Sequence, residues 1–509
     1  PARRCTAVTG ARRRIGGAGA SEAWSTDRIT GGPPEKGGSP MGDAIVVGAG
    51  PNGLTGAVAL ARGGLRVTVL EASDEVGGGT RTGELTVPGL LHDHCSAVHP
   101  MAVGSPYLRE LGLERHGLEW LRSEIDLAHP LPAGDAAVLL RSVDETAARL
   151  GPDGPAWHRL FGPLVAQFDT LAEDLMRPVV HLPRHPIPLS RFGVRALLSA
   201  AGVAARWTTG APRALFAGIA AHAIHPLDRP TTAAVGLILA AAGHRHGWPV
   251  ARGGSRAISD ALAAELADHG GTIETGVRVR SLAELSPADV VLLDLAPSAV
   301  ADIAGDRLPT RVRRAYRRYR HGPGAFKLDL AVEGGVPWTD EACGRAGTVH
   351  VGASFEEIAT AEQEIHRGRM PERPFVLVSQ QYLADPSRSV GDLHPVWAYA
   401  HVPHGYTGDA TEAVLAQIER FAPGLRERIV ATSVRSATDM PQYNSNYIGG
   451  DIITGANTTR QVAFRPRIAL NLYATGIPGV YICSAATPPG AGVHGMCGYN
   501  AARSALSRL

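Results

Sequence analysis

The strongest constraint on the fold is a glycine-rich turn that directly follows a short apolar run. Residues 43–48 read Asp-Ala-Ile-Val-Val-Gly, and the turn continues as Gly48-Ala-Gly50-Pro51-Asn52-Gly53. A helical stretch follows as far as Arg62, and a second apolar run, residues 65–71, ends in an acid. The order of strand, glycine turn, helix and strand predicts a βαβ unit that binds a dinucleotide.

Each position of this turn has a separate task. Gly48 permits the tight turn, Gly50 lets a pyrophosphate approach the backbone, and Gly53 lets helix and strand pack closely. The N-terminus of the helix presents free N–H groups and the positive end of its dipole to phosphates. Glu71 follows Gly48 by 23 positions, where its carboxylate can accept hydrogen bonds from the ribose hydroxyls.

A second glycine-rich loop follows the acid. Residues 71–82 read Glu-Ala-Ser-Asp-Glu-Val-Gly-Gly-Gly-Thr-Arg-Thr, which resembles the second signature of FAD enzymes in the amine oxidase and phytoene desaturase superfamily. In most members an arginine follows the paired glycines and meets the pyrophosphate. Gly79 stands there in this chain, so that contact is lost or passes to Arg81. The resemblance implies cofactor contacts by Ala72, Gly78, Gly79, Thr80, Arg81 and Thr82.

The C-terminal end carries a matching signal. Residues 478–484 are an apolar run that predicts a strand, and the glycine-rich residues 485–498 lead into a predicted helix over 499–509. A glycine-rich loop that enters a helix favours negative charge, which in a flavoprotein develops on the edge of the reduced ring. The residues expected at this edge are Ser484, Ala485, Gly492, Val493, His494, Met496 and Tyr499.

The middle of the chain completes the nucleotide domain. It predicts a helix over 255–269 and strands over 272–279 and 288–294, with Val279 as a further cofactor contact. We therefore expect an α/β fold with a discontinuous Rossmann-like FAD-binding domain and a mixed α+β substrate-binding domain. The FAD-binding domain is assigned to residues 41–98, 245–300 and 441–509, and the substrate-binding domain to residues 99–244 and 301–440.

Further stretches make the resemblance more specific, among them residues 324–332, 374–380, 397–403 and 446–451. Together they resemble the phytoene-dehydrogenase-related FAD oxidoreductases, nearest to the group of pyridine nucleotide-disulphide oxidoreductase domain-containing protein 2 and its bacterial relatives. The resemblance runs from residue 41 to 509. It implies noncovalent FAD between two domains and hydride transfer from a C–N or C–C bond to flavin N5. The chain has no CxxC pair, so disulphide reduction is not implied.

Lys327 is the only lysine after Met41. It lies in a predicted alternating strand, and in amine-oxidase-like relatives a lysine on the comparable strand holds a water against flavin N5. Lys327 is therefore the candidate catalytic residue. The alternative is a salt bridge to Asp329, which lies on the same face of the strand.

Composition excludes several other classes. The net charge of +2 argues against a nucleic-acid binder, and no uncharged apolar run reaches the 18 residues that predict a transmembrane helix. Five scattered cysteines predict a reducing, cytoplasmic location. The HxH pairs at 92–94 and 244–246 lack further ligands, so no metal is expected.

Two basic segments are interpreted separately. Residues 1–40 are rich in glycine, proline and arginine without periodicity, which predicts a disordered leader. Residues 311–320 read Arg-Val-Arg-Arg-Ala-Tyr-Arg-Arg-Tyr-Arg and predict a solvated helix face, with peripheral membrane contact left open.

The sequence thus predicts an FAD-dependent dehydrogenase, desaturase or oxidase that acts on a mainly apolar small molecule. The electron acceptor is left open between oxygen, a quinone and NAD(P). One alternative is a flavin amine oxidase, which needs aromatic side chains around the flavin, whereas aromatics make up only 5% of the chain. Another is a lipid-binding escort protein of the same fold without redox activity, which the intact glycine turn and Glu71 argue against. A flavin-dependent isomerase is a third.

Overall fold

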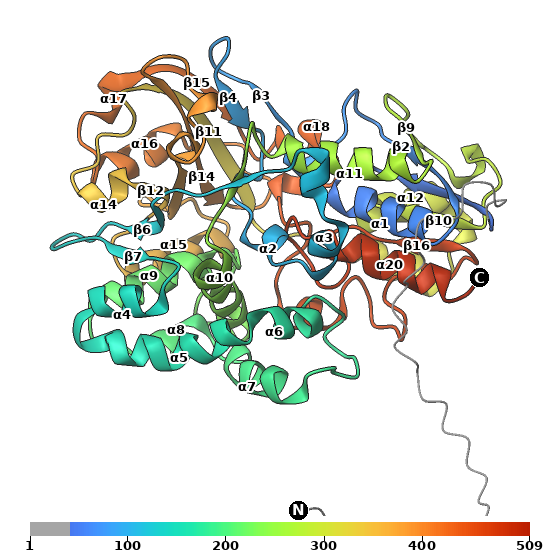
Figure 1. Cartoon of the computed structure of the whole chain (residues 1–509), viewed down its shortest axis with the longest axis horizontal. Helices are drawn as coiled ribbons and strands as arrows, with labels where there is room; N and C mark the ends of the chain where they lie inside the picture. Colours follow the sequence, from blue (N-terminus) through green and yellow to red (C-terminus); the bar gives the residue numbers. More distant parts are fainter. Residues whose placement is uncertain (1–40) are drawn as a thin grey trace, which may run out of the picture.

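The computed structural model describes residues 41–509, and the expected leader at 1–40 lies outside the described residues. Two large sheets occupy the two halves of the molecule, a five-stranded sheet at the right of Figure 1 and a seven-stranded sheet at the left. In the part described, no helix is long and apolar enough to cross a membrane.

The five-stranded sheet is entirely parallel, in the order β16-β10-β1-β2-β9. Alternate residues of β1 face opposite layers, because side chains alternate along a strand. Ala44 and Val46 pack with helix α1, and Ile45 and Val47 pack on the other face with helix α12. The strands are β1 Asp43–Val47, β2 Arg66–Leu70, β9 Thr272–Glu274, β10 Val290–Leu293 and β16 Val480–Ile482.

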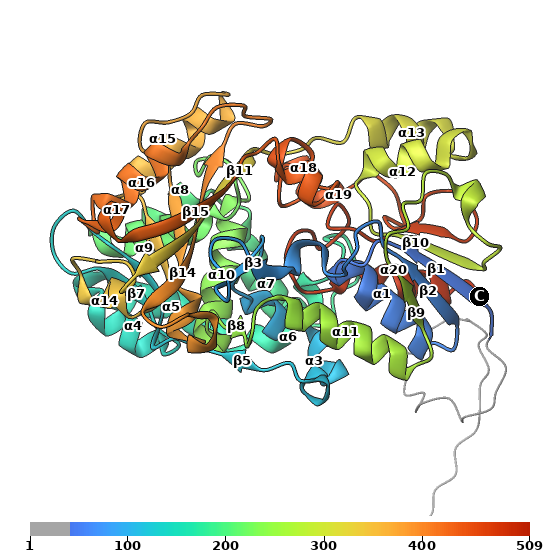
Figure 2. The same cartoon turned by 90° about the horizontal axis from the view of Figure 1, so that it is seen from above.

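Helices cover both faces of this sheet, as Figure 2 shows. One face is covered by α1 (Pro51–Arg62), α11 (Arg256–Asp268) and α20 (Met496–Leu506), and the other by α12 (Pro297–Ala304) and α13 (Thr310–Arg317). Helices α1 and α20 approach each other closely: a Cβ on Gly498 of α20 would lie 1.8 Å from the carbonyl oxygen of Asn52 in α1. Only glycine fits at that crossing.

The seven-stranded sheet is mixed, in the order β15-β11-β14-β13-β12-β6-β7, and β6 with β12 is its parallel pair. One face packs against α16 (Thr411–Glu419) and α17 (Leu425–Arg428). The other faces α9 (Gly210–Ala221) and α10 (Thr232–His246). The strands are β6 Ile125–His129, β7 Ala137–Leu139, β11 Gly324–Glu333, β12 Ala346–Val351, β13 Val376–Ser379, β14 Leu393–Val402 and β15 Ile429–Arg435.

The predicted fold class is confirmed, since a Rossmann-like parallel sheet is joined to a mixed α+β half. Two element boundaries were wrong. The strand predicted over 272–279 ends at Glu274, because Gly276 takes a φ of +72° and turns the chain. The last helix begins at Met496 rather than 499, because Gly495, with a φ of +68°, already directs the chain into the helix. The domain boundaries stay a prediction.

A buried ion pair joins the two halves. Arg388, between β13 and β14, is fully buried, and its Nη1 donates to Oδ2 of Asp93 at 2.6 Å. Asp93 ends β4 (Leu91–Asp93). Its other oxygen accepts the N–H of Ser255, which directly precedes α11, at 2.7 Å. The Asp93 carboxylate therefore bonds to both the seven-stranded half and the nucleotide half.

The remaining donors of this guanidinium are also used. Nη2 donates to the carbonyl oxygen of Ala251 at 2.8 Å, and Nε donates to Asp385 at 3.3 Å. Burial raises the pKa of Asp93, but the Arg388 charge and the Ser255 and Thr82 hydrogen bonds outweigh it and lower the pKa overall. The carboxylate is therefore ionised in the folded chain.

Replacing this arginine should destabilise the whole chain. In Arg388→Met the Asp93 carboxylate stays buried without its cation, which costs about 3–5 kcal/mol. Urea unfolding should show this loss in the free energy of unfolding. Arg367→Met, which removes an exposed partner of Glu364, is the matched control and should leave the midpoint unchanged. Equal effects of the two substitutions would show that the buried pair has no special role.

Candidate functional site

A cavity of about 460 Å³ lies between the two halves, and segments from both line it. Its nucleotide end is formed by the glycine turn, the loop after Glu71 and the loop before α20. Its other end reaches the inner face of the seven-stranded sheet. The predicted site residues that line it are Gly48, Gly50, Pro51, Asn52, Glu71, Ala72, Gly78, Gly79, Arg81, Val279, Ser484, Ala485, Gly492 and Val493.

The glycine turn is a tight backbone cradle. Gly48 has a φ of +101°, and a Cβ on Gly53 would lie 2.0 Å from the Gly48 carbonyl oxygen. Gly53 itself does not line the cavity but allows the turn to close. At the first turn of α1, the side-chain oxygen of Asn52 is buried without a hydrogen-bond partner in the described part of the chain. An unpaired buried polar atom in a cavity wall fits a polar ligand.

Glu71 is positioned at the end of β2 by two backbone donors. Its Oε2 accepts the N–H of Ala49 at 2.7 Å, and its Oε1 accepts the N–H of Ser73 at 2.9 Å. Nη2 of Arg81 lies 3.6 Å from Oε1. The Arg81 guanidinium also donates to backbone carbonyl oxygens, including that of Tyr443, so it is largely committed within the protein.

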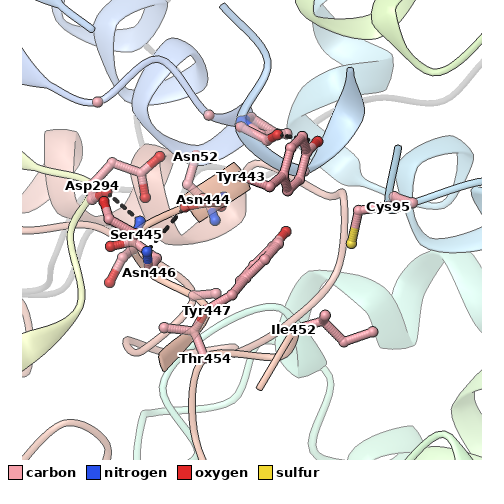
Figure 3. Close-up of a pocket in the computed structure, with 18 of the residues that line it drawn as sticks. Asn52, Cys95, Asp294, Tyr443, Asn444, Ser445, Asn446, Tyr447, Ile452 and Thr454 are labelled. Atoms are coloured by element: carbon pink, nitrogen blue, oxygen red, sulfur yellow. Dashed lines mark hydrogen bonds between the residues drawn. The ribbon is translucent and has the colours of Figure 1, made fainter. Parts of the chain in front are cut away.

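Tyr447 occupies the space beside Gly79, the position where the resemblance would place an arginine. A Cβ on Gly79 would lie 2.3 Å from the Tyr447 hydroxyl, so no larger residue fits there with this tyrosine in place. Tyr443 contacts the same loop, because its hydroxyl donates to the Gly78 carbonyl oxygen at 2.7 Å. Both rings are drawn in Figure 3.

Asp294 places a second carboxyl group against the glycine turn. It directly follows β10, and its Oδ2 accepts the N–H of Gly53 at 2.9 Å. A Cβ on Gly50 would also lie 2.9 Å from Oδ2. Burial raises the pKa of Asp294 to about 7, with a smaller contribution in the same direction from Glu71. Near neutral pH this carboxyl group therefore carries its proton much of the time.

Sequence reasoning missed the far wall of the cavity. Its residues come from segments without a glycine motif: Cys95, His222, Ile224, Leu377, Trp397, Tyr399 and Ile452. Tyr443, Asn444 and Tyr447, beside the Gly78–Gly79 loop, were missed as well. Figure 3 shows these three with Cys95 and Ile452. One available signal was the cluster of aromatic and amide residues over 443–447.

His222 brings an uncharged polar group to this wall. Its Nε2 lies 3.1 Å from Nε2 of His350, a fully buried residue of β12. Burial lowers the pKa of His222 to about 3 and that of His350 well below its usual value. Both imidazoles are therefore neutral at physiological pH.

Several predicted residues lie outside the cavity. Nδ1 of His494 accepts the N–H of Met496 at 3.0 Å, which keeps its ring in the loop before α20. Because α20 begins at Met496, Tyr499 lies inside the helix, where its ring stacks on Tyr107 with centroids 4.0 Å apart. The hydroxyls of Thr80 and Thr82 bond to Ser259 and Asp93 respectively and support the loop from behind.

Lys327 pairs with Asp329 on the same face of β11, the alternative that the strand spacing offered. The lysine is buried, and Nζ lies 5.6 Å from the ring centroid of Trp397. Trp397 lines the cavity, whereas Lys327 does not. A role of Lys327 at flavin N5 stays a prediction.

The histidine pairs are involved in protein contacts. Nδ1 of His92 lies 3.5 Å from Asp329, and His244 accepts the Trp157 indole N–H at 3.1 Å. Elsewhere, ligand atoms of His116, Glu265 and Asp268 lie within 4.8 Å of one another. Arg115 also contacts the Glu265 carboxylate, so ion pairing accounts for this cluster.

The family described as NAD(P)-binding Rossmann-like domain matches residues 46–111. Pyridine nucleotide-disulfide oxidoreductase domain-containing protein 2 of Rattus norvegicus is 24% identical, over 91% of this chain and 93% of its own length. One of the subunits of limonene dehydrogenase from Castellaniella defragrans is 27% identical over 27% of this chain and 25% of its own length.

The solved structure of cyclohexylamine oxidase from Brevibacterium oxydans has a TM-score of 0.55 at 17% identity, over 92% of this chain and 99% of that one. At such identity the likeness shows the fold alone. These comparisons confirm the expected resemblance: residues 46–111 match the NAD(P)-binding Rossmann-like domain, and the chain is similar along most of its length to pyridine nucleotide-disulfide oxidoreductase domain-containing protein 2.

Proposed function

We propose that the chain is an FAD-dependent oxidoreductase that removes hydride from a mainly apolar small molecule. The observation that carries this proposal is the single cavity shared by the two halves. One end has a glycine cradle, the carboxylate of Glu71 and the unpaired amide oxygen of Asn52; the other has apolar and aromatic walls. Such a cavity can hold a dinucleotide and a substrate in contact with each other.

The residues at the nucleotide end fit noncovalent FAD. The backbone N–H groups at the start of α1 would bind its phosphates, and Glu71 would accept hydrogen bonds from its ribose. The backbone of Gly492 and Val493 would lie along the ring, near the N-terminus of α20. When bound, FAD supplies the acceptor of the hydride.

The opposite wall favours an uncharged substrate. Ile224, Leu377 and Ile452 supply aliphatic surface, and His222 supplies a neutral polar group. Among the described lining residues, the acids are Glu71 and Asp294, both at the nucleotide end. The partial match to limonene dehydrogenase supports an apolar substrate. The electron acceptor is oxygen, a quinone or NAD(P), and the rate at which each reoxidises the reduced flavin distinguishes them.

A flavin amine oxidase is the second candidate, and the cavity gives it specific support. Although aromatics are scarce in the chain, four of them line this cavity: Trp397, Tyr399, Tyr443 and Tyr447. The rings of Trp397 and Tyr399 are 5.1 Å apart at 73°. Anaerobic mixing of the flavin-loaded protein with limonene or cyclohexylamine separates the candidates, because only a substrate bleaches the flavin absorbance.

The purified protein should be yellow and should release FAD on denaturation. The fit of the cavity to a noncovalent dinucleotide motivates this expectation, and chromatography of the denatured supernatant measures it. If no flavin is found, even after incubation with FAD, the escort-protein alternative replaces the enzyme.

Glu71→Gln should weaken FAD binding by about 1.5–3 kcal/mol, or roughly tenfold to a hundredfold in Kd, because a hydrogen bond to a charged group is lost. Glutamine keeps one acceptor for the Ala49 or Ser73 N–H, so the fold should survive. Quenching of flavin fluorescence gives the Kd. Glu84→Gln, an exposed change on β3 (Thr82–Glu84), is the control. Unchanged affinity in Glu71→Gln would assign the ribose to another residue.

Binding of FAD should weaken as the pH rises above about 7. Deprotonation of Asp294 then places a negative charge against the phosphate cradle. If FAD binds only when Asp294 is protonated, its Kd rises by up to about tenfold for each pH unit above the pKa. Asp294→Asn keeps an acceptor for the Gly53 N–H but cannot ionise, so its Kd should vary less with pH. Parallel pH profiles for the variant and the wild type would show that Asp294 does not control binding.

A further inference from the structure

The segment around α7 (Pro186–Ala196) exposes an unusual amount of aliphatic surface. Leu182 is 91% exposed, and Val180 and Val194 are each 72% exposed. We name the exposed group the α7 patch; its members are Val179, Val180, Leu182, Ile187, Val194 and Leu197. Large aliphatic side chains gathered in one exposed segment indicate an interaction surface.

Helix α7 is amphipathic but turns apolar residues outward as well as inward. Phe192 and Ala196 are buried against the protein, whereas Ile187 and Val194, two turns apart, face solvent. Figure 1 places α7 at the outer edge of the helical layer, away from the seven-stranded sheet. The patch is therefore accessible to a large partner.

A second segment of the described chain also exposes aliphatic side chains. Ile468 is 63% exposed, and Leu470 is fully exposed. The neighbouring Asn471 bonds to Ser504 of α20 at 2.6 Å, and Asn500, one turn earlier, bonds to the carbonyl oxygen of Met176 at 3.0 Å. The chain before the α7 patch and the chain after residue 470 are therefore anchored on the same side of α20.

Arginines predominate around the α7 patch, although Glu173 and the buried Asp174 lie just before it. Residues 176–227 contain six arginines and no aspartate or glutamate. Within residues 41–509, Arg177, Arg191 and Arg195 form no ion pair, whereas Arg184 pairs with Glu173 at 3.1 Å. Burial and then the charges of Arg184 and Arg503 lower the pKa of Arg177. Unpaired cations beside aliphatic side chains complement an anionic, amphipathic partner.

A small cavity under α7 also combines apolar side chains with arginines. Its volume is about 230 Å³, and Leu160, Leu164 and Leu171 form its apolar wall. Arg191 and Arg195, one turn apart on α7, also line it, together with Pro163, Gln167 and Pro188. Guanidinium groups beside an apolar pocket suit a phosphate joined to a hydrocarbon chain.

We propose that the α7 patch docks on a bilayer containing anionic phospholipids, with its aliphatic side chains in the interface and Arg191 and Arg195 at the lipid phosphates. This proposal does not depend on the flavin chemistry. Peripheral membrane contact was left open for the basic residues 311–320, and the proposal assigns it to α7 instead. In α13, Val312 and Tyr316 are buried, so no aliphatic face accompanies the arginines of that helix.

Sedimentation of the full-length protein with vesicles tests the proposal. Binding is expected to vesicles of phosphatidylcholine with phosphatidylglycerol, and much less to phosphatidylcholine alone. Leu182→Asp and Val194→Asp should each reduce binding more than about tenfold, because each places a charge in the apolar interface. Val430→Asp, on exposed β15, is the matched control. Thermal unfolding of each variant checks the fold.

The charge contribution is tested with a second pair. Arg191→Ala with Arg195→Ala should reduce binding about thirtyfold, since each arginine near an anionic surface contributes about fivefold. Arg311→Ala with Arg314→Ala on α13 should have little effect.

Three results would overturn the proposal. The wild type could fail to bind either vesicle, or the α13 double variant could lose binding while the α7 variants keep it. Sedimentation velocity could also show a dimer that Val194→Asp dissociates, which would make the patch a contact between copies of the chain.

Discussion

The pairing of Arg388 with Asp93 is the contact on which the arrangement of the two halves depends. It lies where the seven-stranded sheet, the β3–β4 hairpin and the start of α11 meet, and it is fully buried. A buried ion pair contributes less to stability than its Coulomb attraction suggests, because both ions lose their hydration. The pair does require a fixed geometry, because each N–H group of the buried Arg388 guanidinium needs an acceptor at hydrogen-bond distance. The cavity walls are therefore held at a defined separation.

This constraint explains how the site can combine unlike surfaces. The nucleotide end is built from backbone: glycines allow the tight turn, and the N–H groups of Ala49, Ser73 and Gly53 fix the carboxyl groups of Glu71 and Asp294. The opposite end is built from side chains on a sheet, where alternation directs Trp397 and Tyr399 toward the cavity and Val396 and Ala398 into the core behind. Neither half encloses the cavity alone.

The sequence predicted the nucleotide half well because its motifs are local. The glycine turn, Glu71 and the loop before α20 each impose a backbone geometry that can be recognised within a few residues. Tyr447 and His222 could not be found in this way, because their place in the wall depends on the packing of β-strands and loops from distant segments. Tyr499 lies inside α20, outside the cavity, because the helix begins about one turn earlier than the end of the glycine-rich run indicated. For Lys327 the resemblance implied a role at the flavin and the strand spacing offered a salt bridge; the ion pair to Asp329 is present, and the flavin role stays a prediction.

The close crossing of α1 and α20 has a consequence for biosynthesis. Strand β16 and helix α20 complete the nucleotide half, yet they are the last parts of the described chain to leave the ribosome. Until then, the face of α1 that meets Gly498 has no partner, and β10 lacks its neighbour at the edge of the sheet. The βαβ unit made first must therefore wait, with apolar surface uncovered, for nearly the whole of translation. Chaperone protection of this early segment until residues 480–506 are made follows from that order of assembly.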